Sequence, residues 1–300
     1  MLSKIAVVSM LAGASLASPA PFVTTPVPDH VKLHHTKPVN GGNFMPGHTS
    51  AVERRDTGEW VNNANIATWN STVIQDGVGD GVDSYTMYWG SGSTADGWPD
   101  KSKWVSFENM FNNYKNQMFQ SCGWENPPQP NNSGPEVGAI WDGIQKAAAA
   151  TGVDHRFILA VLMQESGGCV RVHTTNYGVR NPGLMQDHNG DATCNENGWV
   201  QNPCPNDTIY KMISEGVAGT ASGDGLANCL NQAGTNDVSA FYRAARIYNS
   251  GSISSTGALQ NNIATHCYSS DIANRLTGWV NAASQCNCDN DPNSCGVVLY

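Results

Sequence analysis

A carboxylate, Glu165, stands at the end of an otherwise apolar helical pattern in the segment 158–186. Four residues share one helical face at the positions i, i+3, i+4 and i+7: Ile158, Val161, Leu162 and Glu165. A carboxyl group against apolar walls loses hydration, which disfavours the anion and raises the pKa. Such a group can donate a proton near neutral pH, so the pattern indicates a general acid.

The ends of this helix are also readable in the sequence. Asp154 is a good N-cap, because its side chain can accept hydrogen bonds from the free amides of the first turn. Gly167 and Gly168 favour the left-handed conformation that closes a helix. Glu165 then lies in the last turn, where the helix dipole further disfavours its ionisation. The alternative is a glutamate that points to solvent at a frayed helix end.

Three further segments follow in a recognisable order. GLMQ occupies 183–186, Tyr-Asn-Ser-Gly occupies 248–251 at the end of a second amphipathic pattern, and YSSDIANRLTGW occupies 268–279. Together with Gln-Glu-Ser-Gly at 164–167, they resemble the soluble lytic transglycosylases and goose-type lysozymes, glycoside hydrolase family 23, over residues 135–282. The resemblance implies a lysozyme-like fold and cleavage of a β-1,4-linked glycan.

The resemblance also implies roles for individual side chains. Glu165 would protonate the glycosidic oxygen and then act as the base. Gln186 and Asn249 could hold an N-acetyl group of the sugar, or could fix their loops by hydrogen bonds. Ser166 is either a contact behind the acid or a helix-end bond. Tyr248 would form a wall of the groove, and the hydroxyl of Tyr268 would orient Glu165. For both tyrosines the alternative role is packing in the core.

The sequence leaves the second carboxylate of most glycosidases open. Asp187 and Asp191 follow GLMQ and are the nearest candidates for a nucleophile or base. The family that the chain resembles needs neither, because the N-acetyl and 6-hydroxyl groups of the substrate can complete the reaction. We slightly favour the resulting 1,6-anhydro product over hydrolysis by a positioned water. Three histidines in polar surroundings lack a Ser or Asp partner pattern and are interpreted as surface residues: His173, His188 and His266.

The remaining chain divides into two parts. Residues 56–98 are turn-rich with scattered aromatics, which predicts short strands and loops in a small N-terminal extension that packs on the main domain or binds sugar. Within it, the segment 76–83 lacks the acidic ladder of an EF-hand loop and is interpreted as a polar turn. Residues 99–300 predict a mainly α catalytic domain with a disulfide-rich C-terminal tail, and its helices are expected near 104–114, 135–151, 154–166, 208–220, 237–249 and 268–282.

The N-terminus has the pattern of a processed secretory protein. Lys4 precedes an apolar run that ends in small residues, which predicts a signal peptide over residues 1–20. Residues 21–55 are rich in Pro, His and Gly and end in Arg54-Arg55, which predicts a propeptide. Three N-x-[ST] sequons fit a glycosylated protein of a secreted fungal type: Asn70, Asn131 and Asn206.

The nine cysteines agree with secretion, because all of them follow residue 55 and an oxidising environment favours disulfides. Four bridges would leave one cysteine over. The spacing of Cys286, Cys288 and Cys295 is interpreted as a stapled tail rather than a zinc site, so we expect no metal and no cofactor.

The charge of the chain restricts its partners. Removing residues 1–55 takes five basic and two acidic residues from 16 basic and 25 acidic ones, which leaves a net charge of −12. Nucleic acid is excluded, because phosphates need a basic patch. No membrane segment follows the signal, and we expect a monomer in the extracellular space. The candidate partners are peptidoglycan and, as an alternative, neutral chitin; a third interpretation is a wall-binding or host-interacting protein without turnover.

The dibasic pair yields a prediction about the secreted protein. Cleavage after Arg55 should leave a mature chain that begins at Asp56, because the segment before it has no core-forming pattern to protect it. N-terminal sequencing of the secreted protein tests this. Recovery of residues 21–55 still attached to the mature chain would contradict the propeptide interpretation.

Overall fold

The computed structural model describes residues 59–261, 263–288 and 290–296. The predicted signal peptide 1–20, the propeptide 21–55 and the cleavage point before Asp56 lie outside the described residues.

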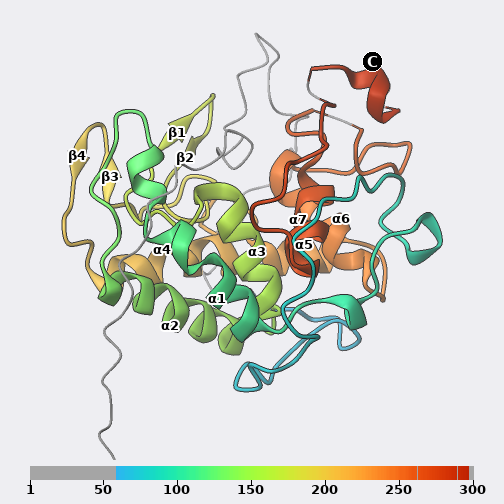
Figure 1. Ribbon diagram of the computed structural model, residues 1–300, viewed down its shortest axis with the longest axis horizontal. Coiled ribbons are helices and arrows are strands. Elements are labelled where there is room, and N and C mark those ends of the chain that lie inside the picture. The colour runs from blue at the N-terminus through green and yellow to red at the C-terminus, as the bar shows by residue number, and fades with distance from the viewer. Residues whose placement is uncertain (1–58, 262, 289, 297–300) are drawn as a thin grey trace, which may run out of the picture.

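The described residues are mainly helical, as the sequence predicts. Two short antiparallel hairpins lie at one side of the helices, and the tail after the last helix lies at the other (Figure 1): β1 Thr175–Asn176 with β2 Arg180–Asn181, and β3 Asn195–Glu196 with β4 Trp199–Val200. The helices of the described part are α1 Phe107–Met118, α2 Gly134–Thr151, α3 His155–Ser166, α4 Asn206–Ala218, α5 Leu226–Gln232, α6 Ser239–Ser250 and α7 Tyr268–Thr277. None of the helices in this part of the chain is long and apolar enough to cross a membrane.

Helix α3 lies in the middle of the core and packs against α1, α2 and α7 (Figure 1). Its residues from Phe157 to Met163 are fully or almost fully buried. The Asp154 side chain accepts from the Arg156 amide as an N-cap, and Gly167 ends the helix at a φ of 59°. Both predicted ends are therefore confirmed, and they fix Glu165 in the last turn.

Other helices differ from the sequence prediction at their ends. The α7 helix stops at Thr277 rather than 282, because Gly278 takes a φ of 118° and the Trp279 amide turns back to the carbonyl of Asn274. The α1 helix starts only after Ser106, whose hydroxyl caps the Asn109 amide. The short helix α5 has no counterpart in the prediction, since seven residues give too little periodicity to recognise.

The prediction of short strands in the N-terminal segment is wrong for its described residues 59–98, which form no strand and pair only at Val78, with Val105. The segment is tied to the end of α2, where the Val61 amide donates to the carbonyl of Thr151 over 2.7 Å. The aromatics of this segment divide in their exposure. Tyr85 and Trp98 are buried, whereas Trp60, Trp69 and Trp89 are exposed.

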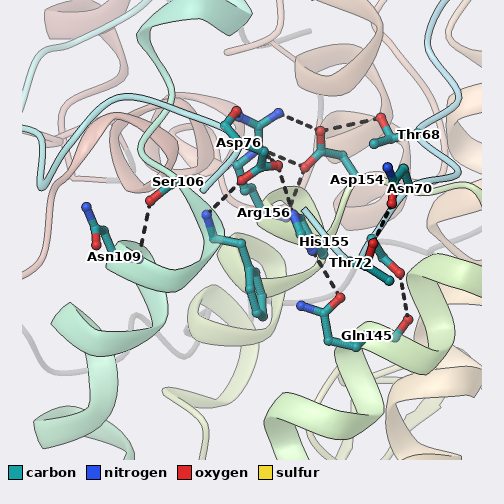
Figure 2. Close-up of polar contacts among 12 residues, drawn as sticks. Thr68, Asn70, Thr72, Asp76, Ser106, Asn109, Gln145, Asp154, His155 and Arg156 are labelled. Carbon is teal, nitrogen blue, oxygen red and sulfur yellow. Dashed lines mark hydrogen bonds and ion pairs between the residues drawn. The ribbon is translucent and has the colours of Figure 1, made fainter. Parts of the chain in front are cut away.

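A polar network locks the first turn of α3 (Figure 2). Arg156 Nη2 lies 2.7 Å from Asp154 Oδ2, and Lys101 Nζ lies 2.8 Å from the same oxygen. Burial would raise the pKa of Asp154, but hydrogen bonds from Arg156 and the charge of Lys101 hold that pKa well below its usual range. Asp76 Oδ2 lies 2.8 Å from His155 Nε2, so residue 76 of the polar turn anchors the N-terminal segment on α3.

Three side chains of types that can bind a metal ion lie close together in this network: Asp76, Asp154 and His155. Two cations, Arg156 and Lys101, already compensate the carboxylates there. The network is therefore interpreted as a set of ion pairs that hold the N-terminal segment on α3.

Four disulfides form, and the prediction of four bridges with one cysteine over is confirmed. The bridges are Cys122–Cys169, Cys194–Cys204, Cys267–Cys286 and Cys288–Cys295. The remaining cysteine, Cys229, is buried. Cys267–Cys286 links the C-terminal tail to the start of α7, and Cys288–Cys295 closes a loop within the tail, so the predicted stapled tail is present.

The disulfides should differ in their contribution to stability. Cys122–Cys169 closes a loop with a separation of 47 residues, whereas Cys288–Cys295 closes one of 7. We expect paired Cys→Ser substitutions to lower the free energy of unfolding by about 4 kcal/mol for the first and about 2 kcal/mol for the second, because the longer loop restricts the unfolded chain more. Urea denaturation measures both values. Equal losses, or a larger loss at 288 and 295, would contradict this.

Candidate active site

Glu165 carries the chemistry of the candidate site. It lies in the last turn of α3 and remains partly exposed, as does Gln164, although residues 155–163 of the helix are buried. The hydroxyl of Tyr268, at the start of α7, donates a short hydrogen bond to Glu165 Oε1. No group of the described residues hydrogen-bonds the second carboxyl oxygen. One oxygen is therefore fixed, and the other can face a substrate.

Burial raises the pKa of Glu165 to about 7, and the hydrogen bond from Tyr268 opposes part of this rise. The carboxyl thus carries a proton over the acidic and near-neutral range. This is the condition that a general acid needs. The expected contact of the Tyr268 hydroxyl with Glu165 is present, although the ring itself is buried in the core, so packing and orientation are combined in one residue.

Tyr248 connects the acid to the GLMQ segment. Its hydroxyl donates to the carbonyl of Met185 over 2.8 Å, and its ring packs against the core. Burial raises the pKa of Tyr248 well above its usual value, and the nearby carboxylates of Asp187 and Glu165 raise it further. The structure therefore brings together the ends of α3 and α6, the segment 183–186 and the start of α7.

Gln186 is hydrogen-bonded to β1 and to its own loop, and Asn249, in the last turn of α6, is hydrogen-bonded to the segment before α7. Thr175 donates to Gln186 Oε1 over 2.9 Å, and Gln186 Nε2 donates to the carbonyl of Gly183 over 3.0 Å. Asn249 Oδ1 accepts from the Thr265 amide over 3.2 Å. For Gln186 these bonds match the loop-fixing role, and a contact with an N-acetyl group would have to replace them.

Ser166 is buried and makes helix-end bonds. Its hydroxyl donates to the carbonyl of Leu162 over 3.1 Å and accepts from the Gly168 amide over 3.2 Å. Of the two roles that the sequence allows, the geometry matches the helix-end bond. Ser166 therefore acts on the acid only by closing the helix that carries it.

Asp187 and Asp191 differ in their surroundings. Asp191 is a surface residue with a side chain that is 84% exposed, near Lys211. Asp187 is buried, and neither of its oxygens accepts a well-formed hydrogen bond from the described residues. Burial and the neighbouring Glu215 carboxylate raise the pKa of Asp187 well above its usual value, against the opposing Gly190 amide and Arg180 charge. A protonated Asp187 is a poor base.

The three histidines are partly buried, and the carbonyl of His173 accepts from Gln186 Nε2 over 3.3 Å. His173 has a half-exposed side chain, and its Nδ1 lies 2.5 Å from Glu125 Oε2, which raises the pKa of the imidazole. His266 Nδ1 lies 2.8 Å from the carbonyl of Gln260. Burial lowers the pKa of His188.

Sequence reasoning missed the residues behind the acid. Gln164 contacts both Asp271 and Arg275 of α7, and Glu215 of α4 stands beside Asp187. Only in α7 did the sequence give a clue to these contacts, because Tyr268, Asp271 and Arg275 share one face of a helix. Glu215 offered no such signal, because nothing in its spacing links it to residue 187.

Searches against protein-family models, curated proteins and solved structures found no match for this chain. The family resemblance therefore rests on the quoted residues of the sequence alone.

The raised pKa of Glu165 predicts a pH-dependent effect on stability. A glutamate that binds its proton more tightly when folded loses stability as the pH rises from about 4.5 towards 7, and the whole penalty is present above 7. We expect Glu165→Gln, which cannot ionise, to raise the free energy of unfolding by about 3 kcal/mol at pH 8.5 and to leave it nearly unchanged at pH 4. Urea denaturation at both pH values measures this.

Glu108→Gln is the control, because that carboxylate lies in an exposed contact with Gln75. It should show no comparable difference between the two pH values. The same change in stability for Glu165→Gln at pH 4 and pH 8.5 would contradict the raised pKa.

Proposed function

We propose that this chain is a secreted glycoside hydrolase or lytic transglycosylase of family 23, with a lysozyme-like catalytic domain over residues 99–300 and a turn-rich extension over 56–98. The observation that carries the proposal is the Glu165 carboxyl, which combines partial exposure, a pKa of about 7 and a hydrogen bond from Tyr268. The arrangement of Tyr248 beside Met185 and Glu165 supports it, because the resembling segments then surround one carboxyl.

In the proposed reaction, Glu165 acts first as acid and then as base. The proton passes to the glycosidic oxygen as its bond to the anomeric carbon breaks, and the resulting carboxylate accepts the hydrogen bond from Tyr268. The 6-hydroxyl of the same sugar then attacks the anomeric carbon and returns a proton to Glu165. Atoms and charges balance, and the carboxyl is restored for the next cycle.

The state of Asp187 favours this one-glutamate route. Burial and the neighbouring Glu215 carboxylate raise the pKa of Asp187, which disfavours the anion that activation of a water would need, and Asp191 points to solvent beside Lys211. Two-carboxylate hydrolysis needs an ionised second group across the bond. The 1,6-anhydro sugar is therefore the favoured product.

The proposed substrate is the β-1,4 bond between N-acetylmuramic acid and N-acetylglucosamine in peptidoglycan. Chitin is the alternative substrate. The net charge of −12 after processing supports this alternative, because a neutral glycan is not repelled by an acidic surface. A wall-binding or host-interacting protein without turnover is the remaining alternative, and the intact acid argues against it. The four disulfides fit an extracellular monomer, with no nucleic acid, membrane or cofactor involved.

Glu165→Gln tests the proposal directly. The amide is nearly isosteric and removes only the transferable proton, so glycan binding should persist while turnover falls about 100-fold or more. Loss of turbidity of bacterial walls, compared with release of soluble sugars from chitin, measures the activity and identifies the substrate. Wild-type activity should also fall as the pH rises through about 7, because the acid loses its proton.

Asp187→Asn and Glu108→Gln are the matched controls. Both should keep most of the activity, and mass spectrometry of the wall fragments should find muramic acid termini that lack one water. Retention of more than about a tenth of the activity by Glu165→Gln would place the acid elsewhere. Hydrated ends together with a large loss in Asp187→Asn would replace the one-glutamate route by hydrolysis.

A further inference from the structure

Helix α7 holds the residue next to the acid as well as the acid itself. Gln164 Nε2 donates to Asp271 Oδ2 over 3.1 Å, and Arg275 Nε donates to Gln164 Oε1 over 2.8 Å. Both ends of one side-chain amide are therefore bound by two residues of α7. This pair of bonds fixes the end of α3 against α7 immediately beside Glu165.

The spacing along α7 couples these bonds to the acid. Tyr268, Asp271 and Arg275 lie at i, i+3 and i+7, so they face the same neighbour. A rotation of α7 by one residue would turn this face by about 100° and remove all three contacts together. The register that binds Gln164 is thus the register that presents the Tyr268 hydroxyl to Glu165.

The N-terminal segment supports α7 from its other side. Tyr85 Oη donates to Asp271 Oδ1 over 2.5 Å, and the amides of Thr86 and Tyr88 donate to Asn274 Oδ1 and Ser270 Oγ. Burial and the Asp271 carboxylate raise the pKa of Tyr85, so its hydroxyl stays a donor. Asp271 accepts from the N-terminal segment with one oxygen and from α3 with the other.

We infer that Tyr85 and Asp271 are positioning residues for the general acid, and that the segment 85–88 keeps α7 in the register that brings Tyr268 to Glu165. The role of the acid in this inference rests on the proposed function. The arrangement itself does not, because the protonation of Glu165 can be measured without a substrate.

The groups around Glu165 determine the pKa that a titration of its carboxyl measures. Tyr268 of α7 donates to the carboxyl, and Tyr248 of α6 lies close enough for the Glu165 charge to act on it. The charge of Cys229 would act on both tyrosines, and that of Asp187 acts on Tyr248. Asp271, Arg275 and Tyr85 stand behind Gln164. The uncharged Tyr85 can affect Glu165 only through the position of α7, whereas the charges of Asp271 and Arg275 also act through space.

The test is a carbon-13 NMR titration of the Glu165 carboxyl in the full mature chain, with Glu165→Gln to assign the signal. Tyr268→Phe should raise the pKa of Glu165 by about one pH unit, because a hydrogen bond to the anion is lost. Tyr85→Phe keeps the ring packed on Trp279 and removes only the hydroxyl. Asp271→Asn keeps the shape but offers one acceptor where two are needed. Tyr85→Phe should raise the pKa of Glu165 by about half a unit. Asp271→Asn should raise it by less, because it also removes a negative charge and that loss favours the Glu165 anion.

Tyr242→Phe is the matched control. Its buried hydroxyl also joins a helix to a preceding part of the chain, through the carbonyl of Pro99 at 2.7 Å directly after the N-terminal segment, but it lies outside the contacts of Gln164. It should lower stability and leave the pKa of Glu165 unchanged.

An unchanged pKa of Glu165 in both Tyr85→Phe and Asp271→Asn, with the expected rise in Tyr268→Phe, would overturn the inference. A rise in Tyr242→Phe as large as in Tyr85→Phe would also overturn it, because general loosening would then explain the effect. Should Asp271→Asn fail to fold, Tyr85→Phe alone decides the result. Failure of the proposed function is seen separately, as absence of glycan cleavage by the wild-type chain whatever the titration gives.

Discussion

The structure depends on keeping one ionisable carboxyl poorly hydrated at the end of a buried helix. Glu165 follows a run of buried residues in α3, and only the last turn reaches partial exposure. Burial alone would favour the neutral acid strongly, and the Tyr268 hydroxyl moderates this preference by hydrogen-bonding the anion. The balance leaves the carboxyl near the midpoint of its titration at neutral pH, where it can both give and take a proton.

The surroundings of Glu165 stay the same only if α3 keeps its position, and other elements bind α3 at both ends. At its start, Arg156 and Lys101 neutralise Asp154, while Asp76 ties the N-terminal segment to His155. At its end, Gln164 is bound by α7. The N-terminal segment takes part at both ends, since Asp76 and Tyr85 belong to it. The segment therefore supports the site in addition to covering the core.

The carboxyls of Glu165 and Asp187 have different surroundings and so different chemistry. Glu165 has a hydrogen-bond donor and access to solvent, whereas Asp187 has a carboxylate neighbour and little exposure. Surroundings of the second kind disfavour the anion, so Asp187 is less suited to act as a base. Burial is the main cause, and Glu215 of α4 adds to it.

The sequence by itself determined the elements whose signals are local. The capped helix with Glu165 in its last turn, the mainly helical pattern and the odd cysteine all follow from periodicity, capping residues and cysteine counting, and the structure confirms each. Only the tertiary structure decided which side chains meet. The contact of Tyr268 with Glu165 was expected from a resemblance and not from the residues, and the contact of Asp187 with Glu215 was not expected. These contacts depend on the register in which helices pack. The sequence of one helix does not determine which face of another helix it will contact.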